Sequence, residues 1–312
     1  MSPRIHAYLL LLVTVVIWGV AGSIIKFTLV EFPPVLFLFY RFAISAVAAL
    51  ATTTIIGFKL PTDRKILFLT ILYGFLTSTV SLGLVFLGFE RTTVVNASLI
   101  SIVGPILVTV AGVLFLREHV TGREKIGIGI AVLGATFTIL EPLLQGTNGS
   151  TLTGNILIFA SLLVAVVTTV IAKILLRDNV EAATATSISF FIGFITFIPI
   201  TLLSYTPSEV ITQIKHASLP YHLGVLYMAL LSGNLAYYLW HKAQKTIEIG
   251  EAAIFAYLSP LFAIPLAVLW LKEVVNTTFV IGAVIIAVGV FIAESKISVP
   301  QTLRSHRLVH RH

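Results

Sequence analysis

The residues of this chain that could do chemistry are polar and aromatic side chains placed inside long apolar runs. The most unusual is Arg41, about eight residues into the apolar stretch that begins at residue 34. If that stretch is a helix crossing a membrane, Arg41 lies roughly 12 Å deep at ~1.5 Å per residue. A charge at such a depth costs at least ~2.5–3.5 kcal/mol, so it should face the protein interior and have a partner. Arg41 is predicted to be either an anion anchor for a carboxylate or phosphate, or a structural clamp to Glu31, Glu90 or helix-end carbonyls.

A second set of candidates combines hydroxyl, amide and aromatic side chains within the apolar runs. Amphipathic rings with hydroxyl or amide tips suit a small zwitterion or a metabolite of mixed polarity. Each residue also has an ordinary structural interpretation, because Ser and Thr bond along or across membrane helices and Trp and Tyr anchor helix ends. Together with Arg41, the candidate substrate-binding residues are Trp18, Ser23, Tyr73, Thr77, Asn96, Ser101, Asn234, Tyr237 and Tyr257.

Several other chemistries lack the residues that they need. The chain has no cysteine, its eight histidines are not spaced as metal ligands, and it contains no Walker-type glycine loop. No Asp or Glu lies at the centre of an apolar run, so a proton-driven mechanism would depend on His241, Glu251 or a boundary residue. We therefore expect no cofactor and no metal. We also expect a protein that is not an enzyme, because an intramembrane enzyme would need clustered acid and base residues.

The elements that must position these residues follow from composition. Hydrophobic residues make up 57% of the chain and charged residues 11%, whereas soluble domains carry about 25% charged residues. The apolar residues fall in runs of roughly 20, the length that a helix needs to cross a hydrocarbon layer of ~30 Å. We therefore predict an all-α membrane protein with ten transmembrane helices, at about 7–25, 34–56, 66–88, 94–116, 125–141, 154–176, 183–204, 221–241, 251–271 and 278–295.

The distribution of Lys and Arg predicts the orientation of these helices. When the loops are assigned alternately to the two sides, 15 basic residues fall on one side and 4 on the other, with Arg41 inside a span. The positive side is the cytoplasmic one, so both termini are predicted to be cytoplasmic in a multi-pass protein of the plasma (inner) membrane. The net charge of +7 then belongs to the loops and to a basic cytoplasmic tail over 297–312. We expect the lipid bilayer, and not nucleic acid, as the partner of these charges.

A repeat divides the chain into two halves. The stretch SIVGPILVTVAGVLFLRE at 101–118 returns as AYLSPLFAIPLAVLWLKE at 256–273, with a constant offset of 155 residues. Five spans per half is an odd number, so the second copy must enter the membrane upside down. Inverted repeats are typical of secondary transporters, in which the substrate site lies near the midplane between the halves. We predict a first five-helix repeat over 1–143 and a second, inverted repeat over 150–296.

Two prolines recur at equivalent places, Pro105 and Pro260, early in the fourth and ninth predicted spans. Proline inside a helix removes one backbone hydrogen bond and bends the helix. The symmetric bends are predicted either to act as hinges beside the substrate site or to be fixed kinks that shape packing.

These features resemble a known family. The repeated pattern A-x(7)-P-x(12)-E-x(8)-G-x(6)-G, and the segment YYLWHKAQK with its counterpart LVFLGFERT, are similar to the EamA domain of the drug/metabolite transporter superfamily. The opening VIWGVAGSIIK and the later LLVAVVTTVIAKILLRD are similar to the start of each domain copy. The resemblance extends from about residue 8 to 295. It implies ten helices, an exporter or facilitator role, and metabolites such as amino acids as substrates.

The sequence thus predicts a secondary transporter, an exporter or facilitator, that carries small metabolites by alternating access. Amino acids or similar neutral or zwitterionic compounds are the expected cargo, and a monomer or weak homodimer is the expected assembly. A nucleotide sugar or sugar phosphate is the alternative substrate class, but its two or more negative charges would want several inward cations. Arg41 is the one cation at depth, with Lys26 and Lys173 near span ends. A membrane signalling or scaffold protein is the non-transport alternative, in which inverted repeats would have no purpose.

Overall fold

The computed structural model describes residues 3–57, 60–116, 122–144, 149–247, 249–275 and 277–294, and within these ranges every regular element is a helix. The predicted basic tail at 297–312 lies outside the described residues. The chain is therefore all-helical over the part that carries the predicted spans.

The first half contains two uninterrupted helices followed by three more complex segments. The third segment changes locally to a π-helix in its middle, and the fourth is interrupted. The bounds are α1 Pro3–Thr28, α2 Pro34–Ile56, α3 Arg64–Gly74, η1 Phe75–Ser81, α4 Leu82–Arg91, α5 Val94–Ser101, α6 Gly104–Leu116 and α7 Gly122–Leu144.

The second half repeats this order, with one additional short helix. A π-helix again lies in the third long segment and an interruption again divides the fourth. The bounds are α8 Gly149–Arg177, α9 Ala182–Ser204, α10 Pro207–His216, α11 Leu219–Leu226, η2 Tyr227–Leu235, α12 Ala236–Gln244, α13 Ile249–Ala256, α14 Ser259–Leu269 and α15 Thr277–Glu294.

Among the described residues, seven helices are long and apolar enough to cross a membrane. Three further apolar helices are shorter, at Gly129–Leu140, Ser259–Leu269 and Phe279–Ile292. Many large apolar side chains on these helices are exposed, including Leu114, Leu203 and Phe291. Exposed apolar side chains on apolar helices are what a hydrocarbon solvent permits and water disfavours. The structure is that of a multi-pass membrane protein.

The predicted bends at the two repeated prolines are complete interruptions of the helix. In the first half, α5 ends at Ser101, and the amides of Ile102 and Val103 bond to carbonyls only three residues back. Pro105 then occupies the first turn of α6, where its missing N–H breaks no helical bond. In the second half α13 ends at Ala256, and Pro260 occupies the first turn of α14.

The extra helix α10 is amphipathic and has no buried residue. It begins with a capping box in which Thr206 accepts a hydrogen bond from the Glu209 amide, and Glu209 accepts one from the Thr206 amide. The hydrogen bonds from Thr206 hold the pKa of Glu209 below its ordinary value. Gln213 joins α10 to the bundle by donating to the Glu31 carbonyl oxygen at 2.8 Å.

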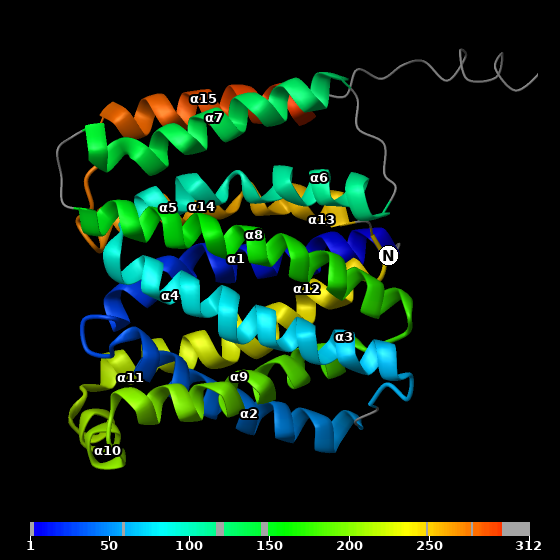
Figure 1. Ribbon diagram of the computed structural model, residues 1–312, viewed down its shortest axis with the longest axis vertical. Helices are drawn as coiled ribbons and strands as arrows, with labels where there is room; N and C mark the ends of the chain where they lie inside the picture. The colour runs from blue at the N-terminus through cyan, green and yellow to red at the C-terminus, as the bar shows by residue number, and fades with distance from the viewer. Residues whose placement is uncertain are drawn as a thin grey trace, which may run out of the picture.

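The long helices lie side by side, with α7 and α15 together at one end of the long axis and α2 and α9 at the other (Figure 1). Glycines bring α7 and α15 close together. A Cβ added at Gly134 would lie 2.7 Å from Ile286 Cγ1, and one added at Gly289 would overlap the backbone of Ala131. Small residues of this kind let membrane helices pack backbone against backbone.

Candidate functional site

A cavity of about 400 Å³ lies in the middle of the bundle, within the usual size range of small-molecule sites. Its wall is built by both halves: α1, η1, α4, α5 and α6 contribute from the first, and α8, η2, α12, α13 and α14 from the second. Arg41 is the contribution of α2, and Tyr73 that of α3. Most of the lining is apolar, with a few polar groups that could orient a ligand.

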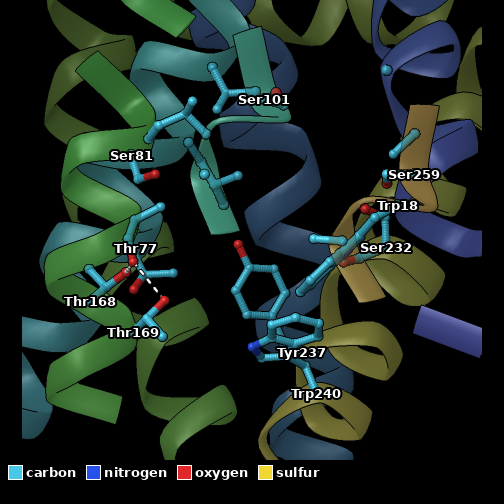
Figure 2. Close-up of a pocket in the computed structure, with 18 of the residues that line it drawn as sticks. Trp18, Thr77, Ser81, Ser101, Thr168, Thr169, Ser232, Tyr237, Trp240 and Ser259 are labelled. Carbon is cyan, nitrogen blue, oxygen red and sulfur yellow. Dashed lines mark hydrogen bonds between the residues drawn. The ribbon is translucent and has the colours of Figure 1, made fainter. Parts of the chain in front are cut away.

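One wall of the cavity carries hydroxyl groups and the other carries aromatic rings (Figure 2). The hydroxyl wall consists of Thr77, Ser81, Thr168 and Thr169, with Ser101 at one end. Opposite lie Trp18, Ser232, Tyr237 and Trp240. A ligand with an apolar body and polar edges would be complementary to these two walls.

The aromatic wall is held in shape by contacts between its own members. The Trp18 ring meets Tyr237 edge-on at 5.3 Å between centroids, and Trp240 at 5.2 Å on a tilt. The Trp18 indole N–H donates to the Ser232 carbonyl oxygen at 3.0 Å. These contacts tie α1 of the first half to η2 and α12 of the second, so the rings are positioned before a ligand arrives.

Arg41 is fully buried at the edge of this cavity and has no hydrogen-bond partner among the described residues. The guanidinium carbon lies 5.5 Å from the centroid of Phe42 and 5.6 Å from that of Phe86. Glu90 instead pairs with Arg91, at 3.6 Å. The alternative expectation of a hydrogen-bonded clamp to Glu31, Glu90 or helix-end carbonyls is therefore wrong, because the guanidinium bonds to no carboxylate or carbonyl in the part of the chain that the structure describes.

His241 links three helices at the cavity wall. Its Nε2 lies 2.8 Å from the Tyr73 hydroxyl, and its Nδ1 lies 3.1 Å from the Thr186 hydroxyl. Both partners can donate or accept, so the ring keeps two hydrogen bonds in either tautomer. This arrangement fixes Tyr73, which a sequence reading places only by its depth in the third span.

The cavity lies between two apolar contacts that join the halves. On one side, Val94 and Val95 at the start of α5 share a cluster with Ala267 of α14. On the other side, Leu11 of α1 packs with Ala243 and Ala252 around α12 and α13, in a separate cluster. Each cluster contains residues from both halves, so the two halves are joined by apolar packing at two separate places.

Lysines bind helix ends at equivalent places in the two halves. Lys26 Nζ donates to the carbonyl oxygens of Phe89 at 2.8 Å and Thr92 at 2.7 Å, at the end of α4. Lys173 Nζ donates to Gln244 at 2.8 Å and Ile247 at 2.7 Å, at the end of α12. Both pairs of acceptors differ by the repeat offset of 155 residues. Cations at helix carboxyl ends satisfy orphan carbonyls and complement the helix dipole.

A glutamate of the second half binds the first broken helix. Glu273 accepts hydrogen bonds from the amides of Val94 and Val95, both at 2.9 Å, at the start of α5. A carboxylate at a helix amino terminus satisfies free N–H groups and complements the dipole. Its repeat counterpart, Glu118, lies outside the described residues.

The structure brings together most of the residues proposed from sequence. Eight of them line the cavity, namely Trp18, Arg41, Tyr73, Thr77, Ser101, Tyr237, Pro105 and Pro260.

The other four lie away from its wall. Ser23 is buried within α1. Asn96 lies in the first turn of α5, where its backbone N–H donates to the capping hydroxyl of Thr93. The Asn234 side chain donates to the Ser45 carbonyl oxygen at 3.1 Å, and Tyr257 lies in the interruption between α13 and α14.

The main lining residues missing from the sequence prediction are Thr168 and Thr169 of α8, Ser232 of η2 and Trp240 of α12. A signal existed for two of them. When Lys173 is aligned with Lys26, Thr168 and Thr169 fall opposite Ala21 and Gly22, which also line the cavity. The repeat therefore predicts their position, though not their chemistry.

Known proteins of similar sequence are described as transporters. An archaeal relative from Archaeoglobus fulgidus, described as an uncharacterized transporter, is 27% identical over 298 residues, which cover 95% of this chain and 99% of the relative. A protein of Escherichia coli described as a probable amino-acid metabolite efflux pump is 23% identical over 286 residues, covering 91% of this chain and 93% of the relative.

A solved crystal structure shares the fold, with a TM-score of 0.66 over 93% of this chain and 98% of that one, at 15% sequence identity. The EamA-like transporter family matches twice, at residues 5–140 and 152–294, so each half of the bundle around the cavity is one copy of its domain. The chain belongs to the EamA-like transporter family.

Proposed function

We propose that this protein carries small neutral or zwitterionic metabolites, amino acids among them, across the plasma membrane by alternating access. The observation that carries the proposal is the cavity that residues of both halves line, together with the two apolar clusters that join the halves. In such a design the halves expose one shared site to each side in turn. The direction of net transport, export or facilitated exchange, then follows from the gradients.

The proposal includes a topology of ten crossings in two inverted repeats, over 1–143 and 150–296, with both termini cytoplasmic. In this proposal the seven long apolar helices and the three shorter ones would provide the ten crossings, and the excess of basic residues in alternate loops supports the orientation. Lys26 and Lys173, which we call the lysine caps, support the repeats, because the residues whose carbonyl oxygens they bind are 155 positions apart in the two halves. The first and last described helix ends lie on the same side of the bundle (Figure 1). We propose a monomer or a weak homodimer as the working unit.

The choice of cargo rests on the polarity of the cavity. Its lining is mainly apolar and carries hydroxyls and rings, with Arg41 as its only guanidinium or ammonium among the described residues. Nucleotide sugars carry more negative charge than one cation can balance, so they are the less favoured alternative. The description of the Escherichia coli relative as an amino-acid metabolite efflux pump supports the same class. A signalling or scaffolding role would leave the cavity between the halves without a use.

Counterflow in proteoliposomes tests the proposal. Liposomes loaded with a mixture of amino acids and related metabolites should accumulate a labelled member of the mixture transiently, and empty liposomes should not. Trp18→Ala should reduce the accumulation because it removes the ring that joins α1 to the aromatic wall. Val47→Ala, at an exposed apolar position of α2, is the matched control. Absence of counterflow for every class of metabolite, by protein that is folded and inserted, would overturn the proposal.

A further inference from the structure

We propose that Arg41 is the carboxylate-binding group of the cavity, and that the preferred substrates are monocarboxylates with an apolar, aromatic body. This inference rests on the proposed transport function and extends the cargo from neutral and zwitterionic metabolites to monoanions that carry one carboxylate. It draws on four independent features: the unsatisfied charge of Arg41, its exception to the repeat, the count of cations, and the aromatic wall.

The first feature is a buried charge without compensation. The guanidinium of Arg41 keeps its charge at any accessible pH. All three of its nitrogens are buried and none has a hydrogen-bond partner among the described residues. The rings of Phe42 and Phe86 offset part of the cost through cation–π attraction. They cannot replace the acceptors that five N–H groups need, so an anion at some point in the transport cycle is the natural complement.

The second feature is that Arg41 breaks the symmetry of the cavity. It is the one lining residue that α2 contributes, whereas the corresponding helix α9 contributes none among the described residues. With the offset that aligns Lys26 and Lys173, Arg41 corresponds to Ile188. A residue needed only to hold the helices together would be expected at both places. Its presence on one side alone fits a role in binding an asymmetric ligand.

The third feature is the number of charges. Two lysines near the cavity, Lys26 and Lys173, already bind carbonyl oxygens at helix ends. Arg41 therefore offers one positive charge, which matches one carboxylate and falls short of a diphosphate or dicarboxylate. No Asp or Glu is among the described lining residues, so an amino group on the ligand would find hydroxyls but no counter-charge. A simple monocarboxylate should bind at least as well as the corresponding amino acid.

The fourth feature is that the guanidinium of Arg41 lies near the aromatic wall, with η2 between them. Gly233 of η2 lies against the guanidinium, since a Cβ added there would be 3.5 Å from Nη2. The neighbouring Ser232 carbonyl oxygen accepts from Trp18, which contacts Tyr237 in turn. A carboxylate at Arg41 would thus leave the body of the ligand beside the aromatic wall. The guanidinium nitrogens are buried in this conformation. In this proposal a shift of the π-helix η2 gives the ligand carboxylate access to them. Segments of π-helix are frequent at functional sites.

A charge series on one ring tests the inference. The probes are 3-phenylpropionate, phenylalanine, 3-phenylpropionamide and phenethylamine, which share the ring and differ in charge. Affinities are measured by calorimetry on the full-length protein in detergent, and counterflow is measured in proteoliposomes. We expect 3-phenylpropionate to bind about 10- to 100-fold more tightly than the amide, the usual difference for a desolvated charge-assisted pair. The affinity for phenylalanine should equal or fall below that for 3-phenylpropionate, and the affinity for phenethylamine should be the lowest of the four.

Variants locate the effect at Arg41. Arg41→Gln should lower the affinity for 3-phenylpropionate to that of the amide while the amide changes by less than about twofold, because only the charged hydrogen bonds are lost. Arg41→Lys should keep part of the preference, since it keeps the charge and loses the planar fork. Lys65→Gln, at an exposed position that removes one positive charge, is the control and should change nothing.

The outcomes separate this inference from the proposed function. Equal affinities of the wild-type protein for 3-phenylpropionate and 3-phenylpropionamide overturn the inference, whether or not the variants fold. Counterflow of the amide in that case would still support the proposed transport function. An unchanged preference in Arg41→Gln also overturns it and assigns Arg41 to packing against Phe42 and Phe86. Absence of counterflow for all four probes and for every other metabolite tried counts against transport itself.

Discussion

The two halves of the cavity repeat the positions of their lining residues and differ in chemistry. With the 155-residue offset, lining residues pair as Thr77 with Ser232, Leu82 with Tyr237, Val85 with Trp240, Phe89 with Gln244, Ser101 with Ala256 and Pro105 with Pro260. The helix interruptions, the π-helices and the lysine caps recur as well. The aromatic wall and Arg41 do not. Repeated features are therefore suited to moving the halves, and unrepeated features to selecting a ligand.

The strongest way to break this comparison is to remove the lysine caps. Lys173→Met should lower the free energy of unfolding by about 3–5 kcal/mol, because the buried ammonium binds two carbonyl oxygens that would lose their partner. Lys26→Met should lower it less, because its side chain is only partly buried. Thermal unfolding of each variant in detergent measures the difference. Arg64→Met, at an exposed site, is the control, and a loss confined to one of the two lysine variants would show that the caps are not equivalent.

The comparison is sharpened by changing one pair whose chemistry differs. Trp240→Ala should weaken binding of an aromatic ligand about 10-fold, since it removes a ring of the aromatic wall. Val85→Ala, at the repeat-related position, should change binding by less than about threefold because only two methyl groups are lost. Calorimetric titration with the same ligand measures both variants. Equal losses would mean that the two walls bind the ligand alike.

Changing the prolines of the interrupted helices should have a smaller effect on transport, and the two changes should favour access to the cavity from opposite sides of the membrane. Pro105→Ala and Pro260→Ala each supply an N–H that can bond across the interruption, so the two helix segments can join into one stiffer helix. In inverted repeats the two sites would act at opposite ends of the cavity, so both variants should slow transport severalfold and shift accessibility in opposite directions. Single cysteines at Ser101 and Ala256, labelled from each side with an impermeant thiol reagent, report the shift. Parallel shifts would leave the prolines as fixed kinks.

The smallest effect concerns α10, which has no counterpart in the first half. The pKa of Glu209 is lowered by its hydrogen bonds with Thr206, so the cap stabilises the helix above the ordinary carboxyl pKa near ~4.3 and is lost as the pH falls through and below that value. The protection factors of the α10 amides, which are corrected for the intrinsic pH dependence of exchange, should therefore fall in acid. Glu209→Gln should show low protection factors at both pH values. Protection factors of the wild-type protein that do not change with pH would contradict the capping role.

The sequence predicts the helical segments well because apolar runs of membrane length are explicit in composition. It predicts the two interruptions only as bends, since a proline by itself does not reveal that Gly104 and Pro105 begin a new helix. Ser23 and Asn96 lie off the cavity although their depth is suitable. A helix that is apolar all round gives no periodic signal for the face that meets the cavity. Depth can be counted along the chain, whereas the direction of a side chain is set by packing.

The unsatisfied guanidinium of Arg41 could not be predicted either. A charge inside an apolar run indicates a partner, and Glu31 and Glu90 are reasonable candidates from the sequence alone. Only the packed bundle shows that Glu90 pairs with Arg91 and that Arg41 faces rings. Which group lacks a partner is a property of the whole fold.

The close packing of α7 against α15 has a consequence for how the protein is made. Gly134 and its contact Ile286 are separated by about 150 residues of chain, so at ~5–20 residues per second the ribosome adds the second roughly 10–30 s after the first. During that interval the glycine face of α7 has only lipid or the insertion machinery beside it. The late synthesis of α15 therefore completes the packing of the first half as well as the second, and a nascent chain halted before α15 should present that face to quality control.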